Sequence, residues 1–118
     1  MRVSIPCMGD NGMEEKVSSH FGRAPMFAIY NTETEELSFI PNKSEHMGGS
    51  GKPPRIMEDE NVDIMLTANL GRRAISMFED IGIHVYCGAR GSISDTLEMW
   101  RDDQLEEATE SNACERGH

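Results

Sequence analysis

The chain has 118 residues and a formal net charge of −10, so it can bury one hydrophobic core but would repel nucleic acid and anionic membranes over most of its surface. No apolar run approaches the roughly 20 residues of a membrane span, and the amino terminus lacks the long apolar stretch of a signal peptide. We therefore expect a soluble, cytoplasmic, single-domain protein with no nucleic-acid partner and no membrane contact. Its three cysteines form no C-x-x-C pair, which argues against a disulfide framework or a closed zinc site and favours free thiols.

The first part of the chain predicts three strands. The opening strand spans residues 2–6 and is followed by a long loop, residues 7–25. The next two strands, residues 26–31 and 37–41, are separated by a short polar segment, residues 32–36, which predicts the turn of a hairpin.

The second part alternates helices and strands. Pro54 can open a short helix that ends near Asn61, and an apolar strand follows at residues 62–67. The clearest helical period covers residues 71–81, and Gly82 ends it.

The last predicted strand, residues 83–87, leads to a second clear helix. This helix begins at Ser92, whose hydroxyl can cap it while Asp95 supplies the S-x-x-D pattern. From residue 103 onward the periodicity is lost, and we expect a short helical remnant. We place a domain at residues 1–108 and a flexible tail at residues 109–118.

The strand order follows from the connections. Right-handed crossovers connect the first, fourth and fifth strands most simply as parallel neighbours, with the hairpin on the other side of the first strand. The resulting order is 3-2-1-4-5, with the second strand antiparallel to the first. Polar residues from several loops then meet at one end of the sheet, outside the carboxyl ends of the parallel strands, where open α/β sheets bind ligands. These residues are Cys7, His20, Arg23, His46, Asn69, Arg72, Cys87 and Arg90.

Two of these loops are locally basic on an acidic protein. Arg72 and Arg73 lie in a segment without acids, and so does Arg90. Each segment leads into the amino terminus of a predicted helix, where free backbone N–H groups and the positive dipole end favour anions. The sequence therefore predicts an anionic ligand, a class that includes both metal-sulfide clusters and phosphates.

The long loop carries the sequence S-S-H-F-G-R-A-P-M-F at residues 18–27. This order resembles the S-x-H-F-G-x-A-x-x-F signature of the dinitrogenase iron-molybdenum cofactor biosynthesis family, the NifX-like proteins. A glycine-rich loop at residues 46–51, A-N-L-G at 68–71 and G-A-R-G at 88–91 follow in the matching order. The resemblance implies a single three-layer α/β domain of ribonuclease-H-like fold, with a five-stranded mixed sheet and helices on both faces. It also implies that residues 1–108 bind or carry iron-molybdenum-type or other metal-sulfur clusters.

His20 is the first candidate ligand, because imidazole is the commonest protein ligand of metals. The arginines would neutralise the charge of a cluster, and glycines let the backbone approach it closely. The candidate cofactor-binding residues are His20, Gly22, Arg23, Asn69, Gly71, Arg72 and Arg90, and the candidate metal ligands are His20, Cys7, Cys87 and His46.

Cys7 and Cys87 are lower-ranked ligands for a geometric reason. In the predicted order they lie two strand spacings apart, roughly 9–10 Å between backbones. That distance is too long for a disulfide and wide for one metal ion, although a multinuclear cluster could bridge it. Each is more readily explained as a buried structural thiol, because buried free cysteines are common.

Several enzyme classes lack their required residues. The segment G-G-S-G-K-P at residues 48–53 is not a phosphate loop, because His46 and Pro53 occupy the positions of its first glycine and its hydroxyl. The first strand offers no carboxylate for a two-metal nuclease.

We therefore predict a non-enzymatic protein that binds, carries or inserts an iron-molybdenum-type or other molybdenum, copper or iron sulfide cluster. Its protein partner would be a metalloenzyme or a cluster-assembly protein. Two alternatives remain: a module that binds a phosphate-bearing small molecule at the same loops, and a protein-interaction domain that docks on a metalloenzyme.

Overall fold

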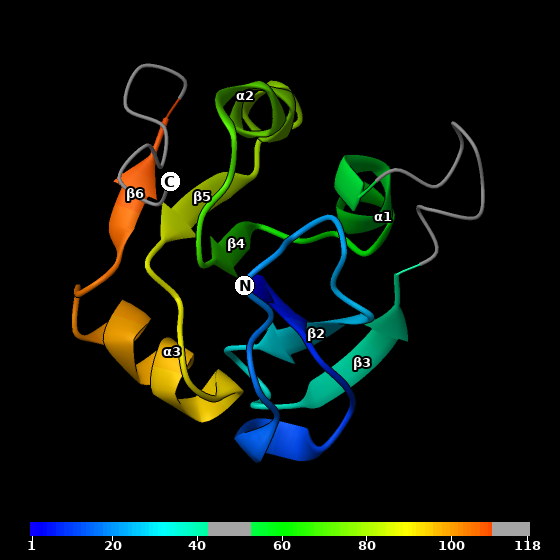
Figure 1. Ribbon diagram of the computed structural model, residues 1–118. Helices are drawn as coiled ribbons and strands as arrows, with labels where there is room; N and C mark the ends of the chain where they lie inside the picture. Colours follow the sequence, from blue (N-terminus) through cyan, green and yellow to red (C-terminus); the bar gives the residue numbers. More distant parts are fainter. Residues whose placement is uncertain (43–52, 110–118) are drawn as a thin grey trace.

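A six-stranded mixed sheet forms the centre of the molecule (Figure 1). The computed structural model describes residues 1–42 and 53–109. The strands lie in the order β3-β2-β1-β4-β5-β6. Their bounds are β1 (Arg2–Cys7), β2 (Met26–Asn31), β3 (Leu37–Pro41), β4 (Ile64–Thr67), β5 (His84–Cys87) and β6 (Glu106–Ala108). The predicted order of the first five strands is therefore confirmed.

The pairing directions also agree with the prediction. β1 runs antiparallel to β2 and parallel to β4, and β4 runs parallel to β5. β2 and β3 form the predicted hairpin. Its turn is held by the Asn31 side chain, whose Oδ1 accepts hydrogen bonds from the backbone N–H groups of Glu33 (2.8 Å) and Thr34 (3.2 Å).

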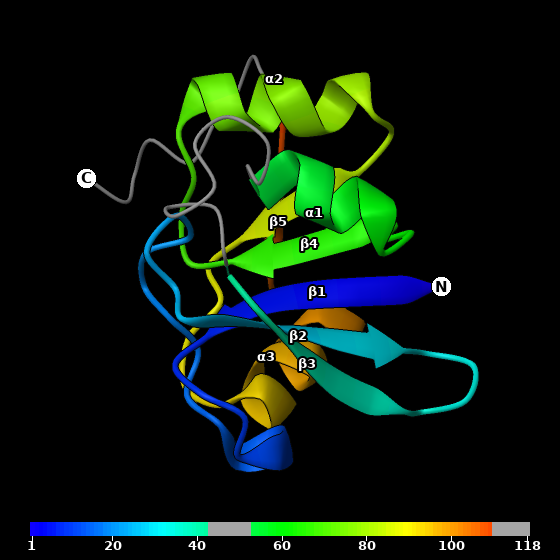
Figure 2. The ribbon, with the colours of Figure 1, turned by 90° about the vertical axis from the view of Figure 1, so that its right-hand side faces the viewer.

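Helices cover both faces of the sheet, so the fold has three layers (Figure 2). α1 (Pro53–Asp59) and α2 (Arg72–Asp80) lie on one face. α3 (Ile93–Arg101) lies on the other, together with a single 3-10 turn, η1 (Gly12–Glu14). The three-layer arrangement of one α/β domain is confirmed, and the ribonuclease-H relationship stays a prediction of the resemblance.

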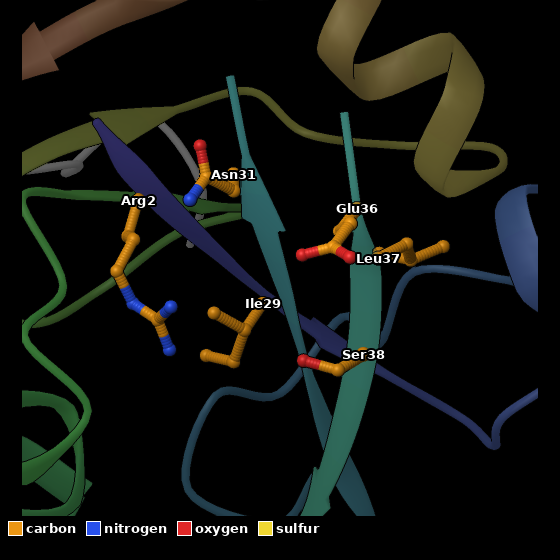
Figure 3. Close-up of a pocket in the computed structure, with 6 residues that line it drawn as sticks. All are labelled: Arg2, Ile29, Asn31, Glu36, Leu37 and Ser38. Atoms are coloured by element: carbon orange, nitrogen blue, oxygen red, sulfur yellow. The ribbon is translucent and has the colours of Figure 1, made fainter. Parts of the chain in front are cut away.

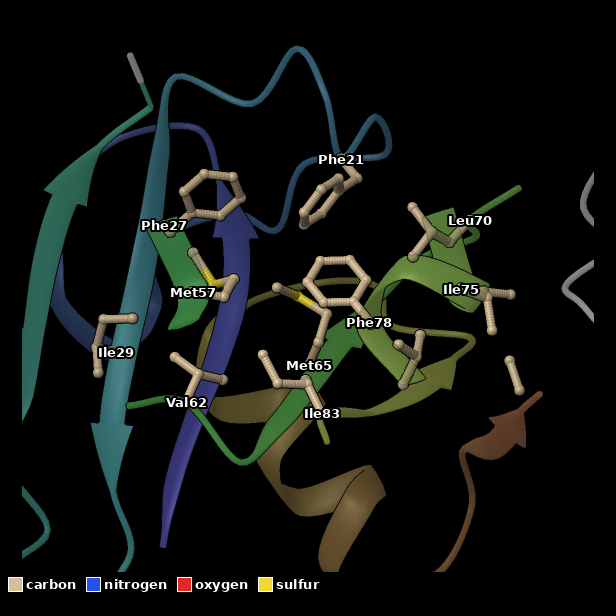
Figure 4. Close-up of a cluster of buried hydrophobic side chains, with 12 residues drawn as sticks. Phe21, Phe27, Ile29, Met57, Val62, Met65, Leu70, Ile75, Phe78 and Ile83 are labelled. Carbon is tan, nitrogen blue, oxygen red and sulfur yellow. The ribbon is translucent and has the colours of Figure 1, made fainter. Parts of the chain in front are cut away.

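Each face of the sheet has its own core, because successive side chains of a strand point to opposite faces. Figure 4 shows the core under α1 and α2, where Phe27 and Met65 of the sheet meet Met57 of α1 and Phe78 of α2. The core under α3 contains side chains from β1, β2, β4 and α3. Twelve large core side chains are less than 2% exposed, so both layers are closely packed on the sheet.

The start of α3 follows the sequence prediction. Ser92 Oγ accepts from the Asp95 backbone N–H (3.0 Å), and the Asp95 carboxylate accepts from the Ser92 N–H (3.2 Å). This is a complete capping box, which typically contributes about 1 kcal/mol to helix stability.

The end of the domain differs from the prediction. The expected helical remnant after residue 103 is wrong: Glu106–Ala108 forms β6, which pairs antiparallel with β5 and makes the sheet six-stranded rather than five-stranded. Ala108 is only 4% exposed and packs in the core under α2, so its burial holds this short strand at the sheet edge. Beyond Thr109 the predicted tail lies outside the described residues.

The parallel strands β1, β4 and β5 all end at one edge of the sheet. Three loops leave this edge: residues 8–25 after β1, residues 68–71 after β4 and residues 88–92 after β5. We call them the carboxyl-edge loops. No helix within residues 1–42 and 53–109 is long and apolar enough to cross a membrane.

Candidate functional site

The first and third carboxyl-edge loops are joined by backbone hydrogen bonds. The Val17 N–H donates to the Gly91 carbonyl (2.9 Å), and the Ile93 N–H donates to the Glu15 carbonyl (2.9 Å). These loops therefore form a short antiparallel pairing beyond the end of the sheet. The segment that carries His20 is fixed relative to the segment that carries Arg90.

The second and third carboxyl-edge loops are joined in the same way. The N–H groups of Gly88 and Ala89 donate to the carbonyls of Ala68 and Thr67, each at 3.1 Å. Gly88 has a φ of +106°, a backbone conformation that a side chain would disfavour. All three loops thus belong to one hydrogen-bonded platform.

Ser18 fixes the backbone around His20. Its hydroxyl donates to the His20 carbonyl (3.1 Å) and accepts from the His20 N–H (3.2 Å), and Ser18 itself is only 4% exposed. On the far side of the turn, the Asn42 amide nitrogen donates to the carbonyls of Gly22 (3.3 Å) and Ala24 (2.9 Å). The imidazole of His20 is exposed on this fixed backbone, as the candidate role requires.

Phe21 is the hydrophobic anchor of the same turn. Its ring is 6% exposed and lies 5.3 Å from the Phe27 ring and 5.5 Å from the Phe78 ring, centroid to centroid. Leu70 of the second loop packs in the same core cluster (Figure 4). The residues that flank these two anchors in the chain are exposed at this edge of the sheet: His20, Gly22, Arg23, Asn69, Gly71 and Arg72.

The amino terminus of α2 lies at the same edge of the sheet. Gly71 occupies the N-cap position, and no side chain caps the helix there. A Cβ atom built on Gly71 or on Gly22 meets no other atom within 4 Å, so both glycines face open space. Backbone N–H groups at an uncapped helix start can bind an anion.

Arg90 is exposed on a fixed backbone. Its carbonyl accepts a hydrogen bond from the hydroxyl of Thr96 (3.1 Å), which is completely buried. The next residue, Gly91, has a φ of +78°, and a Cβ atom there would lie 2.7 Å from the Asp95 carboxylate. An open cavity of about 330 Å³ adjoins the loop and is lined by Arg90, Gly91, Asp95, Glu98 and Met99.

Cys7 is placed differently from the other candidates. It is completely buried in the core under α3, and its Sγ lies 3.2 Å from the Gly9 carbonyl, to which the thiol donates. Burial raises the pKa of the Cys7 thiol from 9.0 to about 11, and the nearby Glu15 adds to the effect. At neutral pH the sulfur is therefore a protonated thiol rather than the thiolate that binds metals.

Cys87 lies on the opposite face of the sheet. It packs against the core under α2, whereas Cys7 packs under α3, and β4 separates their strands. The structure therefore does not bring the two sulfurs together. Cys87 is disulfide-bonded, so the expectation of a free thiol at this position is wrong, and its sulfur becomes available to a metal only after reduction.

Cys7 should make stability fall at alkaline pH. Its pKa is higher in the folded than in the unfolded chain, so the folded state keeps a proton that the unfolded state loses above pH 9. We expect this one group to lower the free energy of unfolding by about 1.4 kcal/mol between neutral pH and pH 10. Urea unfolding of the wild type and of Cys7→Ala at both pH values measures it. Equal pH dependence of the two proteins would contradict the assignment.

No group of three or more His, Cys, Asp or Glu side chains is arranged to hold a metal ion within the part of the chain that the structure describes. His46 lies outside the described residues, so its role as a ligand stays a prediction. The site therefore offers exposed imidazole, guanidinium and backbone N–H groups on one platform rather than a closed ligand cage.

Some positioning residues were not predicted from the sequence. Ser18 opens the S-x-H-F-G pattern, and that place in the motif was the available signal. Asn42 directly follows β3, where an Asn often holds a turn. Thr96 gave no signal, because a Thr inside a helix is usually only a packing residue.

The chain matches a protein family and is similar to several individual proteins. The family model described as "Dinitrogenase iron-molybdenum cofactor" matches residues 1–103. The uncharacterized protein MJ0580 of Methanocaldococcus jannaschii is 29% identical over 111 residues, which is 90% of each chain. The crystal structure of PH0822 is 34% identical and has a TM-score of 0.75, covering 91% of this chain and 96% of that one. The apo form of the orange protein from Desulfovibrio gigas has a TM-score of 0.81 at 20% identity, covers 91% and 92% of the two chains, and supports the fold alone.

Proposed function

Since the chain belongs to the dinitrogenase iron-molybdenum cofactor family, we propose that it binds a preassembled metal-sulfur cluster at the carboxyl-edge loops and carries or inserts it. The cluster would be of iron-molybdenum type or another molybdenum, copper or iron sulfide. It is the cargo of this protein, and a metalloenzyme or a cluster-assembly protein would receive or supply it. The observation that carries the proposal is the hydrogen-bonded platform that holds three polar loops at one edge of the sheet.

The kind of donors on the platform supports a cluster rather than a bare ion. A bare zinc or copper ion needs three or four protein ligands, whereas metals in a cluster are already coordinated by sulfide. Such a cargo needs few protein ligands and neutralisation of its negative charge. The exposed imidazole of His20 can supply a ligand or a hydrogen bond, and the guanidinium groups of Arg23, Arg72 and Arg90 can supply positive charge.

We also propose that the protein is not an enzyme. Carrying a cluster requires binding and release but no proton transfer or nucleophile. Cys7, a nucleophilic side chain in the described part of this edge, is buried and keeps its proton at neutral pH.

His20→Ala tests the role of the imidazole. We expect the variant to keep a melting temperature near that of the wild type, because His20 is exposed and contributes little to the core. It should bind tetrathiomolybdate, a soluble anionic metal sulfide, at least tenfold more weakly under anaerobic conditions, as followed by visible absorption. A tenfold loss corresponds to about 1.4 kcal/mol.

His84→Ala is the matched control. It removes an imidazole from the first residue of β5, at the opposite edge of the sheet, where His84 contacts Glu107 at 3.0 Å. This variant should bind tetrathiomolybdate as the wild type does. Equal binding by His20→Ala and the wild type would show that His20 is not part of the site. A large drop in the melting temperature of His20→Ala would show that His20 has a structural role instead.

The alternative ligands are separated by the same assay. Competition of ATP or inorganic phosphate with tetrathiomolybdate at similar concentrations would favour the module that binds phosphate-bearing molecules. Binding of none of these would favour the docking domain. The uncapped start of α2 is the feature that a phosphate would also use.

A further inference from the structure

A second cavity lies at the edge of the sheet opposite to the carboxyl-edge loops. It has a volume of about 370 Å³ and opens on the face of the sheet that carries α1 and α2. The residues that line it come from β1, from β2, from the turn between β2 and β3 and from the start of β3: Arg2, Ile29, Asn31, Glu36, Leu37 and Ser38. We call it the amino-edge cavity.

The strand register places opposite charges on the two sides of this cavity. Arg2 of β1 pairs with Asn31 of β2, and the Asn31 N–H donates to the Glu36 carbonyl (2.9 Å). The three residues thus form a row across neighbouring strands, with the cation and the anion two strand spacings apart, roughly 9–10 Å between backbones. In the next row, Ile29 pairs with Ser38 and forms the floor.

Arg2 and Glu36 do not neutralise each other. The Arg2 side chain turns toward the end of α1, where Nε donates to the Glu60 carbonyl (2.7 Å) and Nη2 contacts the Glu60 carboxylate (3.3 Å). A guanidinium has five N–H donors, so three of them stay available. Within the described residues, the Glu36 carboxylate forms no ion pair and accepts only a long hydrogen bond from the Thr34 hydroxyl (3.4 Å).

The uncharged groups add a donor and an acceptor. Both hydrogen bonds that the Asn31 side chain makes within the described part of the chain are accepted by its Oδ1, which leaves its amide nitrogen with no acceptor there. Figure 3 shows the Glu36 carboxylate and the Ser38 hydroxyl directed toward Ile29, with the Arg2 guanidinium on the other side of that residue. Donors therefore gather on the Arg2 side and acceptors on the Glu36 side.

We propose that the amino-edge cavity binds a free α-amino acid. Its carboxylate would receive hydrogen bonds from Arg2 and the Asn31 amide, and its ammonium group would donate to Glu36 and Ser38. The opposed charges select a zwitterion. A simple anion would lie against the Glu36 carboxylate, which has no ion pair in the described residues, and a simple cation would make no use of the Arg2 donors that Glu60 leaves available. The volume lies at the small end of the range for ligand pockets, which suits a molecule of this size.

Amide NMR spectra of the ¹⁵N-labelled protein test this proposal. The probes are L-alanine, L-leucine, L-glutamine and L-lysine, each titrated into the full chain without any metal sulfide. We expect at least one of them to give saturable shifts at Asn31, Glu36 and Ser38. No saturable shift with any of the four would overturn the proposal.

Two comparisons then test the recognition of each charge. Glu36→Gln should weaken binding of the best probe at least tenfold, whereas Glu35→Gln should leave binding unchanged, since Glu35 carries the same charge in the same turn but does not line the cavity. The N-acetyl derivative, which has no ammonium group, and the amide derivative, which has no carboxylate, should both bind at least tenfold more weakly. Equal weakening by the two variants, or undiminished binding of either derivative, would show that the cavity does not recognise a zwitterion.

Discussion

Phe21→Ala is expected to lower the free energy of unfolding by about 3–5 kcal/mol, the usual loss for removing a buried phenylalanine ring. The Phe21 ring is 6% exposed and contacts the rings of Phe27 and Phe78, so its loss leaves a cavity between the first carboxyl-edge loop and α2. The turn that presents His20 would lose its anchorage as well. Urea unfolding measures the first effect, and tetrathiomolybdate binding well below the melting temperature measures the second.

Phe39→Ala is the control for this substitution. Phe39 is half-buried on the edge strand β3 and lies on the opposite face of the sheet, in contact with the core under α3. It should cost less stability than Phe21→Ala and leave tetrathiomolybdate binding unchanged. A loss below about 1 kcal/mol for Phe21→Ala would mean that the loop relaxes without its anchor.

Reversal of two charges should have the largest effect on binding. We expect Arg72→Glu combined with Arg90→Glu to weaken tetrathiomolybdate binding by about 100-fold or more, which corresponds to about 2.8 kcal/mol. Exposed charges more than about 8 Å apart are largely screened at physiological salt. Only arginines close to the bound metal sulfide should therefore affect its binding strongly. Binding titrations at two salt concentrations should also show a weaker salt dependence in the double variant.

Arg55→Glu combined with Arg101→Glu changes the net charge by the same amount. Arg55 is exposed on α1 and Arg101 ends α3, and neither belongs to the carboxyl-edge loops. Because Arg101 donates a hydrogen bond to the Tyr30 hydroxyl (3.0 Å), circular dichroism must confirm that this variant is folded. Equal weakening by the two pairs would mean that net charge, rather than a local site, governs binding.

The sequence was sufficient for most of the architecture. Apolar strands joined by helices leave few right-handed arrangements, so the order of the first five strands could be predicted. The capping box at Ser92 and Asp95 could be predicted because it depends only on nearby residues. β6 could not, because Glu106 and Glu107 are poor strand formers and only the packing of Ala108 and the pairing with β5 hold the segment extended.

The candidate site could likewise be predicted from the sequence only in part. Shared placement of the loops at one edge follows from strand direction, which the sequence determined well. The surroundings of each cysteine could not be predicted from the sequence, because the face to which a side chain points depends on the register of its strand. In the structure, Cys7 and Cys87 point to opposite faces of the sheet. The backbone hydrogen bonds that join the loops leave no trace in side-chain chemistry and could be found only in the structure.

The most direct test of the central proposal is a map of the tetrathiomolybdate site. Amide NMR spectra of the ¹⁵N-labelled protein, recorded anaerobically during a titration, report every backbone N–H group separately. If the carboxyl-edge loops bind the metal sulfide, signals of residues 20–23, 69–72 and 88–91 should shift saturably, while those of residues 31–36 at the opposite edge stay in place. Saturable shifts confined to any other part of the molecule, or no saturable shift at all, would contradict the account.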